Sequence, residues 1–252
     1  MDKKMPEKKS STTMEKIVSL CKRRGFVFPG SELYGGLANT YSYGPLGSEL
    51  KNNIKKIWWK YFVQDREDMV GIDGPILLNA KVWEASGHVE NFKDTLVECK
   101  KCHHRFRPDK LKDASKCPDC GGAFTDEKMF SGMFKTVIGP VEEEGVVTYL
   151  RPETAQAIFT DYKNILSATN RKIPFGVGQI GKAFRNEVTT GNFIFRTYEF
   201  EQMEIEYFIS SEADWNGIFE EWLTYMRGFL KNIGLEDKKL HNHEIPDKER
   251  AF

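Results

Sequence analysis

Two strand candidates joined by a tight loop constrain the fold of this chain more than any other feature. Residues 175–184 and 193–209 are rich in aromatic and β-branched side chains, and the loop Val188-Thr-Thr-Gly-Asn192 separates them. Strands connected over so short a loop pair as an antiparallel hairpin. We therefore predict an antiparallel sheet at the centre of the structure.

Helical periodicity surrounds this hairpin. Apolar side chains recur at helical spacing after Thr13 and again in three later segments. The predicted helices cover residues 13 to about 25, 46–63, 154–166 and 214–230. Residues 69–79 form a further strand candidate with a turn at 71–75. These elements predict an α+β fold in which helices flank the antiparallel sheet.

Composition and charge narrow the class of protein. Hydrophobic residues make up 40% of the 252 residues and charged residues 29%, which excludes wholesale disorder. The 37 basic and 37 acidic residues cancel, which does not favour a sequence-independent nucleic-acid binder. The apolar runs are too short for a membrane span and no signal segment opens the chain, so we predict a cytoplasmic protein without membrane contact. We expect residues 1–13 to form a mobile tail.

One local segment has a basic excess. Lys100–Lys116 holds seven Lys or Arg residues against two Asp residues. Such a segment is typical of a local nucleic-acid contact, and equally of a solvated surface around a metal site. Both interpretations remain open.

Two CxxC pairs predict a metal centre. Cys99 and Cys102 precede Cys117 and Cys120 by a spacing that lets two turns aim four thiolates at one point. Four thiolates complete a tetrahedral Zn²⁺ shell with no open position, so the predicted zinc is structural. Disulfides are uncommon in a cytoplasmic chain, and a redox CxxC does not need a second copy. His103 and His104 could each replace a thiolate.

Two segments carry more charge than a helix start or a hairpin requires. The first is RPETAQ at 151–156, and the second joins FRNE at 184–187 to the strand beginning at residue 196. Alternate residues of a strand share a face. One face is therefore expected to carry Arg196, Tyr198, Phe200, Gln202, Glu204 and Glu206. A solvated edge strand has a similar pattern, but the facing strand end at Arg185 favours a functional site.

These segments also carry a family resemblance. FRNE, a short loop and RTYEFEQME are similar to motif 2 of class II aminoacyl-tRNA synthetases, and RPETAQ resembles a signature of their glycine-specific members. RGFVFPGSELYGGLANTYSYGPLG, LKNNIKKIWWKYFV and WEASGH also resemble bacterial-type, homodimeric glycyl-tRNA synthetases. The resemblance runs from about residue 15 to the end. It implies a glycine–tRNA ligase, which activates glycine with ATP and transfers it to tRNA(Gly).

The resemblance implies an ATP site around motif 2. Arg185 would contact the α-phosphate, Glu187 the adenine amino group and Arg196 the outer phosphates, so these three are the expected catalytic residues. Phe200 would stack on adenine, and Mg²⁺ would accompany the phosphates. The expected ATP-binding residues are Arg185, Asn186, Glu187, Phe195, Arg196, Thr197, Tyr198, Glu199 and Phe200.

A glycine site must recognise an ammonium group and the absence of a side chain. Carboxylates from Glu153 and Glu204 suit the ammonium, and the resemblance implies that Arg107 reaches the substrate from the cysteine segment. A tight wall would exclude the extra methyl group of alanine. The expected glycine-binding residues are Arg107, Glu153, Phe200, Glu201, Gln202, Met203 and Glu204.

The resemblance also implies a domain plan. Residues 14–98 and 125–252 form the expected catalytic domain, and residues 99–124 a zinc-ribbon-like insertion. No sequence resembling motif 3 follows, so we expect an incomplete catalytic domain. The alternative is a truncated, non-catalytic module that binds tRNA or nucleotide. The helix expected at 46–63 resembles the dimer element, motif 1, and implies a homodimer.

Overall fold

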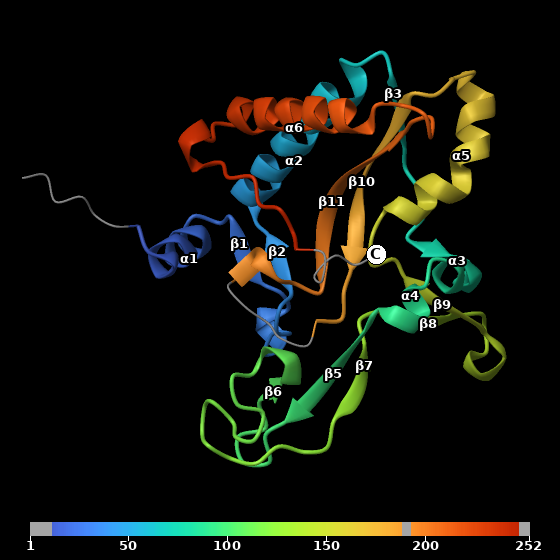
Figure 1. Cartoon of the computed structure of the whole chain (residues 1–252). Helices are drawn as coiled ribbons and strands as arrows, with labels where there is room; N and C mark the ends of the chain where they lie inside the picture. Colours follow the sequence, from blue (N-terminus) through green and yellow to red (C-terminus); the bar gives the residue numbers. More distant parts are fainter. Residues whose placement is uncertain (1–11, 188–192, 247–252) are drawn as a thin grey trace, which may run out of the picture.

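A three-stranded sheet forms the centre of the molecule. The computed structural model describes residues 12–187 and 193–246 (Figure 1). The sheet has the order β11-β10-β3, with β3 at Met69–Ile72, β10 at Phe175–Phe184 and β11 at Glu199–Phe208. β10 and β11 pair antiparallel from Phe175↔Phe208 to Phe184↔Glu199, which confirms the predicted hairpin. The predicted loop at 188–192 lies outside the described residues.

The second strand is shorter than predicted. Phe193–Phe195 form a 3₁₀ turn in which Phe193 has a positive φ of 62°. The hydroxyl of Thr197 then donates to the carbonyl of Glu199 at 2.7 Å, and regular pairing begins there. The expectation that Arg196 and Tyr198 lie on the strand face is therefore wrong, because a turn occupies the start of the segment.

The sheet is mixed rather than purely antiparallel. β3 pairs parallel to β10, from Gly176↔Met69 to Gln179↔Ile72. The strand-and-turn prediction for 69–79 matches β3 and the short β4 at Leu77–Leu78. The parallel pairing puts β3 beside the inner strand and leaves β11 at the edge among the described strands.

Two long helices cover one face of the sheet (Figure 1). α2 spans Pro45–Trp59 and continues as a π-helical turn at Lys60–Gln64, and α6 spans Trp215–Asn232. Asp214 caps α6 as predicted, since its carboxylate accepts from the amide of Gly217 at 3.1 Å. The core here consists of Trp58, Phe62, Val63 and Phe229, with Ile180 and Ile205 packed against it from the sheet.

The opposite face is covered at one end by α5, which spans Ala155–Thr169 (Figure 1). Ile158 and Ile165 of this helix pack on Phe175 and Val177 of β10. This confirms the helix predicted at 154–166 and extends it by three residues. The other end of this face is left to the loops that carry the charged segments.

The remaining elements are short. Thr13 caps α1 (Met14–Arg23), since its hydroxyl accepts from the amide of Lys16 at 3.4 Å. The expected tail is described only at Thr12 and Thr13. The other helices and strands are β1 Val27–Pro29, β2 Tyr41–Tyr43, α3 Ala80–Ala85, α4 His88–Asn91, β5 Lys93–Glu98, β6 Arg105–Phe106, β7 Lys128–Ser131, β8 Lys135–Ile138 and β9 Val146–Leu150. Single 3₁₀ turns lie at Glu32–Tyr34, Pro108–Lys110, Glu142–Glu144 and Asp237–Lys239.

These strands form three small sheets besides the central one. β1 pairs with β2, the order β4-β9-β8 forms a second sheet, and β6-β5-β7 forms a third that projects from the body of the molecule (Figure 1). Within the described residues, no helix has the length and apolarity that crossing a membrane requires.

Candidate active site and cysteine cluster

Alternation along β11 assigns its side chains to two different environments. Phe200, Gln202, Glu204 and Glu206 pair in register with Ala183, Gly181, Gln179 and Val177 of β10, on the face that α5 partly covers. Glu201 and Met203 belong to the opposite face, where α2 lies. The expected glycine-binding residues of β11 therefore lie on two opposite faces of the sheet, with Gln202 and Glu204 on one face and Glu201 and Met203 on the other.

A buried arginine holds the segment at 151–156 against the sheet. Arg151 is 2% exposed, and its guanidinium donates to the carbonyl of Lys182 at 2.7 Å and to that of Gly74 at 2.8 Å. Burial lowers the pKa of this side chain. Because all these acceptors are backbone carbonyls, Arg151 positions the loop and leaves ligand contact to its neighbours.

An acidic cluster follows Arg151. The carboxylate of Glu204 accepts from the amide of Thr154 at 3.1 Å and from the hydroxyl of the same residue. Glu153 accepts from the side-chain amide of Gln156 at 2.8 Å, and the ring of His88 lies 3.3 Å from the same oxygen. Two carboxylates are thereby fixed at the start of α5.

The pKa values of Glu153 and Glu206 are shifted in opposite directions. The hydrogen bond from His88 lowers the pKa of Glu153, against the effect of burial. Burial raises the pKa of Glu206 to about 7, and the charges of Glu204 and Glu153 add to this rise. The cluster therefore presents concentrated negative charge that an ammonium group would neutralise.

Several amides beside this cluster lack partners among the described residues. Gln179 is 0% exposed, and neither its side-chain oxygen nor its nitrogen is hydrogen-bonded there. The side-chain oxygens of Gln156 and Gln202 are likewise unpartnered within the described part of the chain. Buried polar atoms without partners are costly, so their gathering beside the carboxylates marks a polar ligand site.

A separate cavity of about 250 Å³ lies next to the acidic cluster. It is lined by Asn91, Phe92, Lys93, Asp94, Arg107, Gly132, Arg185, Asn186, Glu187 and Arg196. Arg185 lies between the two sites. Its Nε donates to the carbonyl of Pro152 at 3.1 Å, directly before Glu153. The Arg185 guanidinium is also 5.4 Å from the ring centroid of Phe200 and 5.8 Å from that of Phe92.

Two arginines of this cavity form ion pairs with neighbouring carboxylates. Arg196 pairs with Glu187 at 3.2 Å. Arg107 pairs with Asp94 at 3.0 Å and with Asp109 at 3.1 Å. Arg107, which was expected to bind glycine, lines this cavity rather than the acidic cluster. An anion entering the cavity would meet three arginines.

Of the other expected nucleotide residues, Asn186 lines this cavity, whereas Phe195, Thr197, Tyr198 and Glu199 lie outside its lining. The amide of Asn186 donates to the carbonyl of Gly132 at 2.8 Å, and that of Arg185 to the carbonyl of Tyr198 at 2.9 Å. The Tyr198 ring packs edge-on against Phe134. Phe195 is 79% exposed. Thr197, described above, closes the turn before β11.

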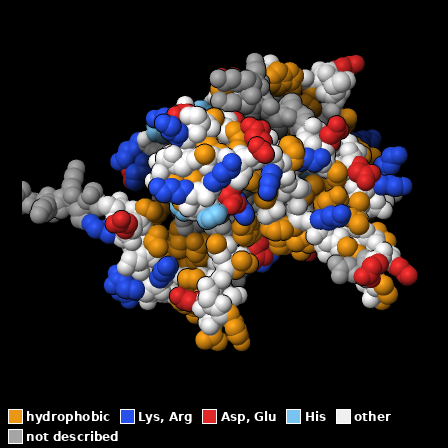
Figure 2. All heavy atoms as spheres, turned by 90° about the horizontal axis from the view of Figure 1, so that it is seen from below, with side chains coloured by type: hydrophobic (Ala, Val, Ile, Leu, Met, Phe, Trp, Pro, Cys, Tyr) orange, Lys and Arg blue, Asp and Glu red, His pale blue; other side chains and the backbone are white. Residues whose placement is uncertain are grey.

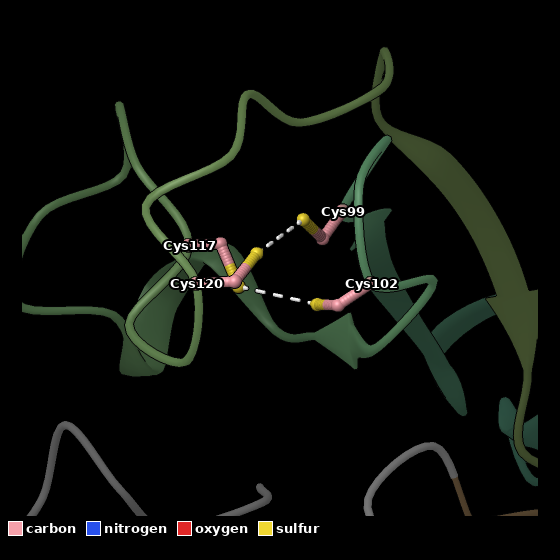
Figure 3. Close-up of side chains that lie close together, drawn as sticks. All are labelled: Cys99, Cys102, Cys117 and Cys120. Carbon is pink, nitrogen blue, oxygen red and sulfur yellow. Dashed lines mark hydrogen bonds between the residues drawn. The ribbon is translucent and has the colours of Figure 1, made fainter.

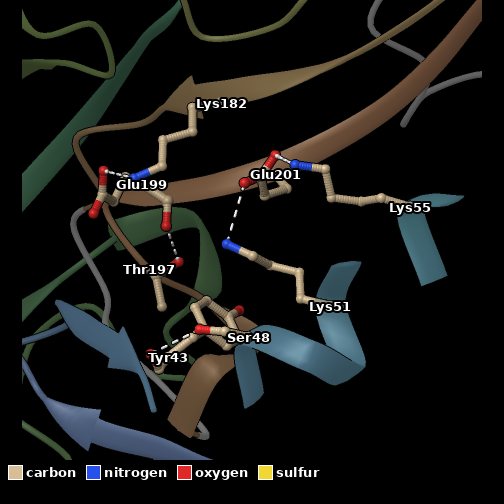
Figure 4. Close-up of polar contacts among 8 residues, drawn as sticks. All are labelled: Tyr43, Ser48, Lys51, Lys55, Lys182, Thr197, Glu199 and Glu201. Atoms are coloured by element: carbon tan, nitrogen blue, oxygen red, sulfur yellow. Dashed lines mark hydrogen bonds and ion pairs between the residues drawn. The ribbon is translucent and has the colours of Figure 1, made fainter. Parts of the chain in front are cut away.

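Glu199 and Glu201 lie on the α2 side (Figure 4). Glu201 accepts from Lys51 at 3.2 Å and from Lys55 at 3.3 Å, and Glu199 pairs with Lys182 at 3.0 Å. Burial alone would raise the pKa of Glu201, but the two lysines outweigh it and lower the pKa. The structure does not bring Glu201 or Met203 to the acidic cluster.

Three residues of the cluster were not among the expected site residues. The alternation of side chains along the strand predicted that Glu206 shares a face with Gln202 and Glu204, but Glu206 was not among the expected site residues. Thr154 and His88 had no periodic signal, since one begins a helix and the other follows a turn at Gly87. The sequence signal that could have identified them is their place in the family-like segments, Thr154 in RPETAQ and His88 in WEASGH.

The four cysteines of the two CxxC pairs gather in one place (Figure 3). Their sulfur atoms all lie within 4.8 Å of one another, with Cys99 and Cys120 at 3.4 Å and Cys102 and Cys117 at 3.6 Å. Sulfurs at the corners of a tetrahedral zinc–thiolate shell are about 3.8 Å apart. The donor set and its spacing therefore fit a zinc ion.

Backbone turns build this cluster. The amide of His103 donates to the carbonyl of Cys99 at 2.9 Å, and that of Gly121 to the carbonyl of Cys117 at 2.8 Å. Amide groups at Cys102 and Lys101 point at the Cys99 sulfur and lower its pKa to about 6. A thiolate is the form that binds metal.

Two of the seven basic residues in the segment beside the cysteines form ion pairs with described residues. Arg105 contacts Glu98 at 3.0 Å, and Arg107 contacts Asp94 at 3.0 Å. Basic and acidic side chains are interspersed on the face that this module presents (Figure 2). The structure thus favours neither interpretation of the segment.

Comparisons with known proteins identify related chains. Residues 135–251 match the family model of the tRNA synthetase class II core domain (G, H, P, S and T). The chain is 53% identical to a glycine–tRNA ligase of Treponema denticola, over 95% of this chain and 54% of that one. It is 49% identical to that of Thermobifida fusca (94% and 54%) and 48% identical to that of Clostridium acetobutylicum (97% and 59%). The chain thus spans a little more than half the length of these curated relatives.

A solved structure shares the fold at low sequence identity. It is described as the RNA-binding domain of threonyl-tRNA synthetase from Cryptosporidium parvum, and has a TM-score of 0.57 with 16% identity. The match covers 86% of this chain and 42% of the other. The identities of about 50% over most of this chain make it a homologue of the glycine–tRNA ligases, and residues 135–251 carry a class II tRNA synthetase core domain.

Proposed function

We propose that this chain carries the glycine- and ATP-recognising site of a glycine–tRNA ligase. The observation that supports this most is Arg185, which lies between an arginine-lined cavity and an acidic cluster. One side suits the phosphates of ATP and the other suits an amino acid's ammonium group. The guanidinium of Arg185, between the cavity and the cluster, would contact the α-phosphate of ATP, where the carboxylate of the amino acid attacks.

In this proposal the cavity binds ATP. Arg185 contacts the α-phosphate, Glu187 accepts from the adenine amino group, and Arg196 holds the outer phosphates. Phe200 stacks on adenine, and Asn186, Phe195, Thr197, Tyr198 and Glu199 complete the nucleotide site. The Arg196–Glu187 ion pair must then open, since both partners would turn to the ligand. Mg²⁺ enters with ATP and neutralises phosphate charge.

The acidic cluster is the proposed glycine site. Glu153 and Glu204 accept from the ammonium, while Gln202 offers its unpartnered amide oxygen. Arg107 reaches the substrate across the cavity. Glu201 acts from the other face of β11, where its ion pairs with Lys51 and Lys55 hold the strand against α2, and Met203 lies on the same face.

The proposed reaction has two steps. A carboxylate oxygen of glycine attacks the α-phosphorus of ATP, and the bond to pyrophosphate breaks, which yields glycyl-adenylate. A ribose hydroxyl at the 3′ end of tRNA(Gly) then attacks the glycyl carbonyl, and AMP leaves with the bonding electrons. Positioning and charge neutralisation supply the catalysis, without a covalent enzyme intermediate.

The cysteine cluster is proposed to hold structural zinc in an insertion at 99–124, with the catalytic domain at 14–98 and 125–252. The sheet that supports the cluster runs from Lys93 to Ser131, somewhat beyond the insertion. The test is zinc content after Cys102→Ser, with Cys21→Ser, on α1, as the matched control. We expect the first variant to lose zinc and the second to keep it; retention by both would overturn the assignment.

The assembly and location are also proposals. The exposed apolar residues Leu46, Leu50 and Ile57 on α2 favour a homodimer. Four cysteines gathered as a metal site suit the cytoplasm, where thiols are kept reduced and tRNA is charged.

The activity is tested by glycine-dependent exchange of pyrophosphate into ATP. It is measured with this chain and with a form extended to the full length of its relatives. We expect exchange with glycine and at least about tenfold less with alanine, as a filled pocket predicts. Exchange by the longer form alone would identify this chain as a binding module. Absence of glycine-dependent exchange in both would contradict the proposed function.

A further inference from the structure

His88 belongs to neither expected set of site residues, yet it contacts the acidic cluster. It begins α4, directly after Gly87, whose φ is +75°. The side chain is 12% exposed. It packs edge-on against Trp83, which is fully buried, with ring centroids 5.5 Å apart. A nearly buried imidazole with both nitrogens in polar contact has a fixed orientation.

The two ring nitrogens connect a serine to a carboxylate. Nδ1 lies 2.8 Å from the hydroxyl of Ser86, and Nε2 lies 3.3 Å from Oε1 of Glu153. Glu153 accepts at Oε1, so Nε2 must carry a proton to form a favourable contact. Ser86 can serve either state of Nδ1, since its hydroxyl both donates and accepts.

Both donors to Glu153 use the same oxygen. Gln156 donates to Oε1 at 2.8 Å, and His88 approaches that atom as well. Within the described residues, no hydrogen bond or ion pair engages Oε2. The pair of donors therefore fixes the plane of the carboxylate and leaves one oxygen available.

We propose that His88 is a positioning residue for glycine: together with Gln156 it holds Oε1 of Glu153, so that Oε2 accepts from the substrate ammonium. The hydroxyl of Ser86 orients the imidazole through its contact with Nδ1, the ring nitrogen that does not face Glu153. This inference rests on the proposed function, because it assigns the glycine ammonium to Glu153. His88 itself does not touch the substrate.

Charge supports the same assignment. Glu153 shares its surroundings with Glu206, whose pKa the charge of Glu153 helps to raise, and with Arg185, which favours the ionised form of Glu153. The hydrogen bond from His88 is the largest contribution to the lowered pKa of Glu153. Without that donor, the carboxylate would be less ionised and would be held by Gln156 alone.

The test compares His88→Leu, which removes the donor, with His88→Gln, whose amide can replace Nε2–H. His241→Gln, at an exposed histidine outside the site, is the control. We expect His88→Leu to raise KM for glycine at least about tenfold, because a hydrogen bond to a charged group is lost. KM for ATP should change less than about twofold, and His88→Gln should recover most of the loss. Equal changes in both KM values, or no rescue by glutamine, would overturn the proposal.

A second measurement does not depend on catalysis. The titration of Glu153 is followed by carbon-13 NMR in the wild-type chain and in His88→Leu, with assignment from Glu153→Gln. We expect the variant to raise the pKa of Glu153, and an unchanged pKa would overturn the role of His88. If the pKa rises as expected but the wild type neither binds nor activates glycine, the proposed function fails while the contact between His88 and Glu153 stands.

Discussion

At the residue scale, the pKa values of Glu201 and Glu206 are shifted in opposite directions because the two side chains point to opposite faces of β11 and have different neighbours. Glu201 faces Lys51 and Lys55, which lower its pKa. Glu206, on the other face, has burial and two carboxylates, which raise its pKa to about 7. Glu201 is therefore held as an anion by its lysines, whereas the pKa of Glu206 lies close to neutral pH.

Glu206 predicts a specific pH dependence of stability. Its folded-state pKa of about 7 lies above the ordinary value of 4.5, so the folded chain keeps a proton that the unfolded chain releases. The contribution of this group to the free energy of unfolding is therefore full below pH 4.5 and falls as pH rises to about 7. Glu206→Gln should become more stable relative to the wild type across that window.

The measurement is the melting temperature of the wild type and of Glu206→Gln at several pH values. Glu212→Gln, at an exposed glutamate, is the control. A melting-temperature difference that stays constant with pH would show that Glu206 does not titrate in this window.

At the element scale, β10 depends on a glycine where the Arg151 guanidinium crosses it. A Cβ at Gly181 would lie 2.1 Å from Nη2 of Arg151. Gly181→Ala should displace that guanidinium and its bonds to the carbonyls of Lys182 and Gly74. We expect a loss of at least about 2 kcal/mol in the free energy of unfolding. Lys182→Ala, next on the strand but half-exposed, should cost less than about 1 kcal/mol, because it breaks only a surface ion pair. Similar losses from both would contradict this account.

The cysteine module should unfold by itself when zinc is removed. Its short strands β5, β6 and β7 have little core of their own, whereas the β10–β11 hairpin packs on two helix layers. Chelation should accelerate amide hydrogen exchange in 93–131 and leave it unchanged in the hairpin. Equal protection of the module before and after metal removal would contradict a structural zinc.

The elements could be predicted largely because their signals are local. The spacing of Trp58 and Phe62, the cap at Asp214 and the hairpin pattern of β10 and β11 all reside in short stretches of sequence. The parallel pairing of β3 could not be predicted, because it joins segments about a hundred residues apart. The late start of β11 was missed for a local reason, since the aromatic Phe193–Phe195 has a strand-like composition but forms a turn.

At the scale of the whole molecule, the site was predictable in its residues and less so in its geometry. The motifs named Arg185, Glu187 and Glu153, and strand alternation separated Glu204 from Glu201 in principle. The position of Arg185 between the arginine-lined cavity and the acidic cluster could be recognised only in the three-dimensional structure. The same holds for His88, which reaches Glu153 from a different part of the chain.

The outer surface of α2 predicts the assembly. Leu46, Leu50 and Ile57 are 49%, 51% and 43% exposed, while Trp58 of the same helix is buried in the core. Burying such a stripe against a second copy would stabilise a dimer. We expect analytical ultracentrifugation to show a dimer for the wild type and for Asn52→Glu, on the polar side of the helix, and a monomer for Leu50→Glu. A monomeric wild type, or a dimer that survives Leu50→Glu, would contradict this prediction.

The central claim is that the arginine-lined cavity and the acidic cluster are two halves of one site, joined at Arg185. Calorimetry with a non-hydrolysable sulfamoyl analogue of glycyl-adenylate tests this most directly. We predict one binding site per chain, competition by both ATP and glycine, and at least about tenfold weaker binding for Arg185→Lys and for Glu153→Gln. Binding that ATP displaces but glycine does not, or that survives both substitutions, would contradict a shared site.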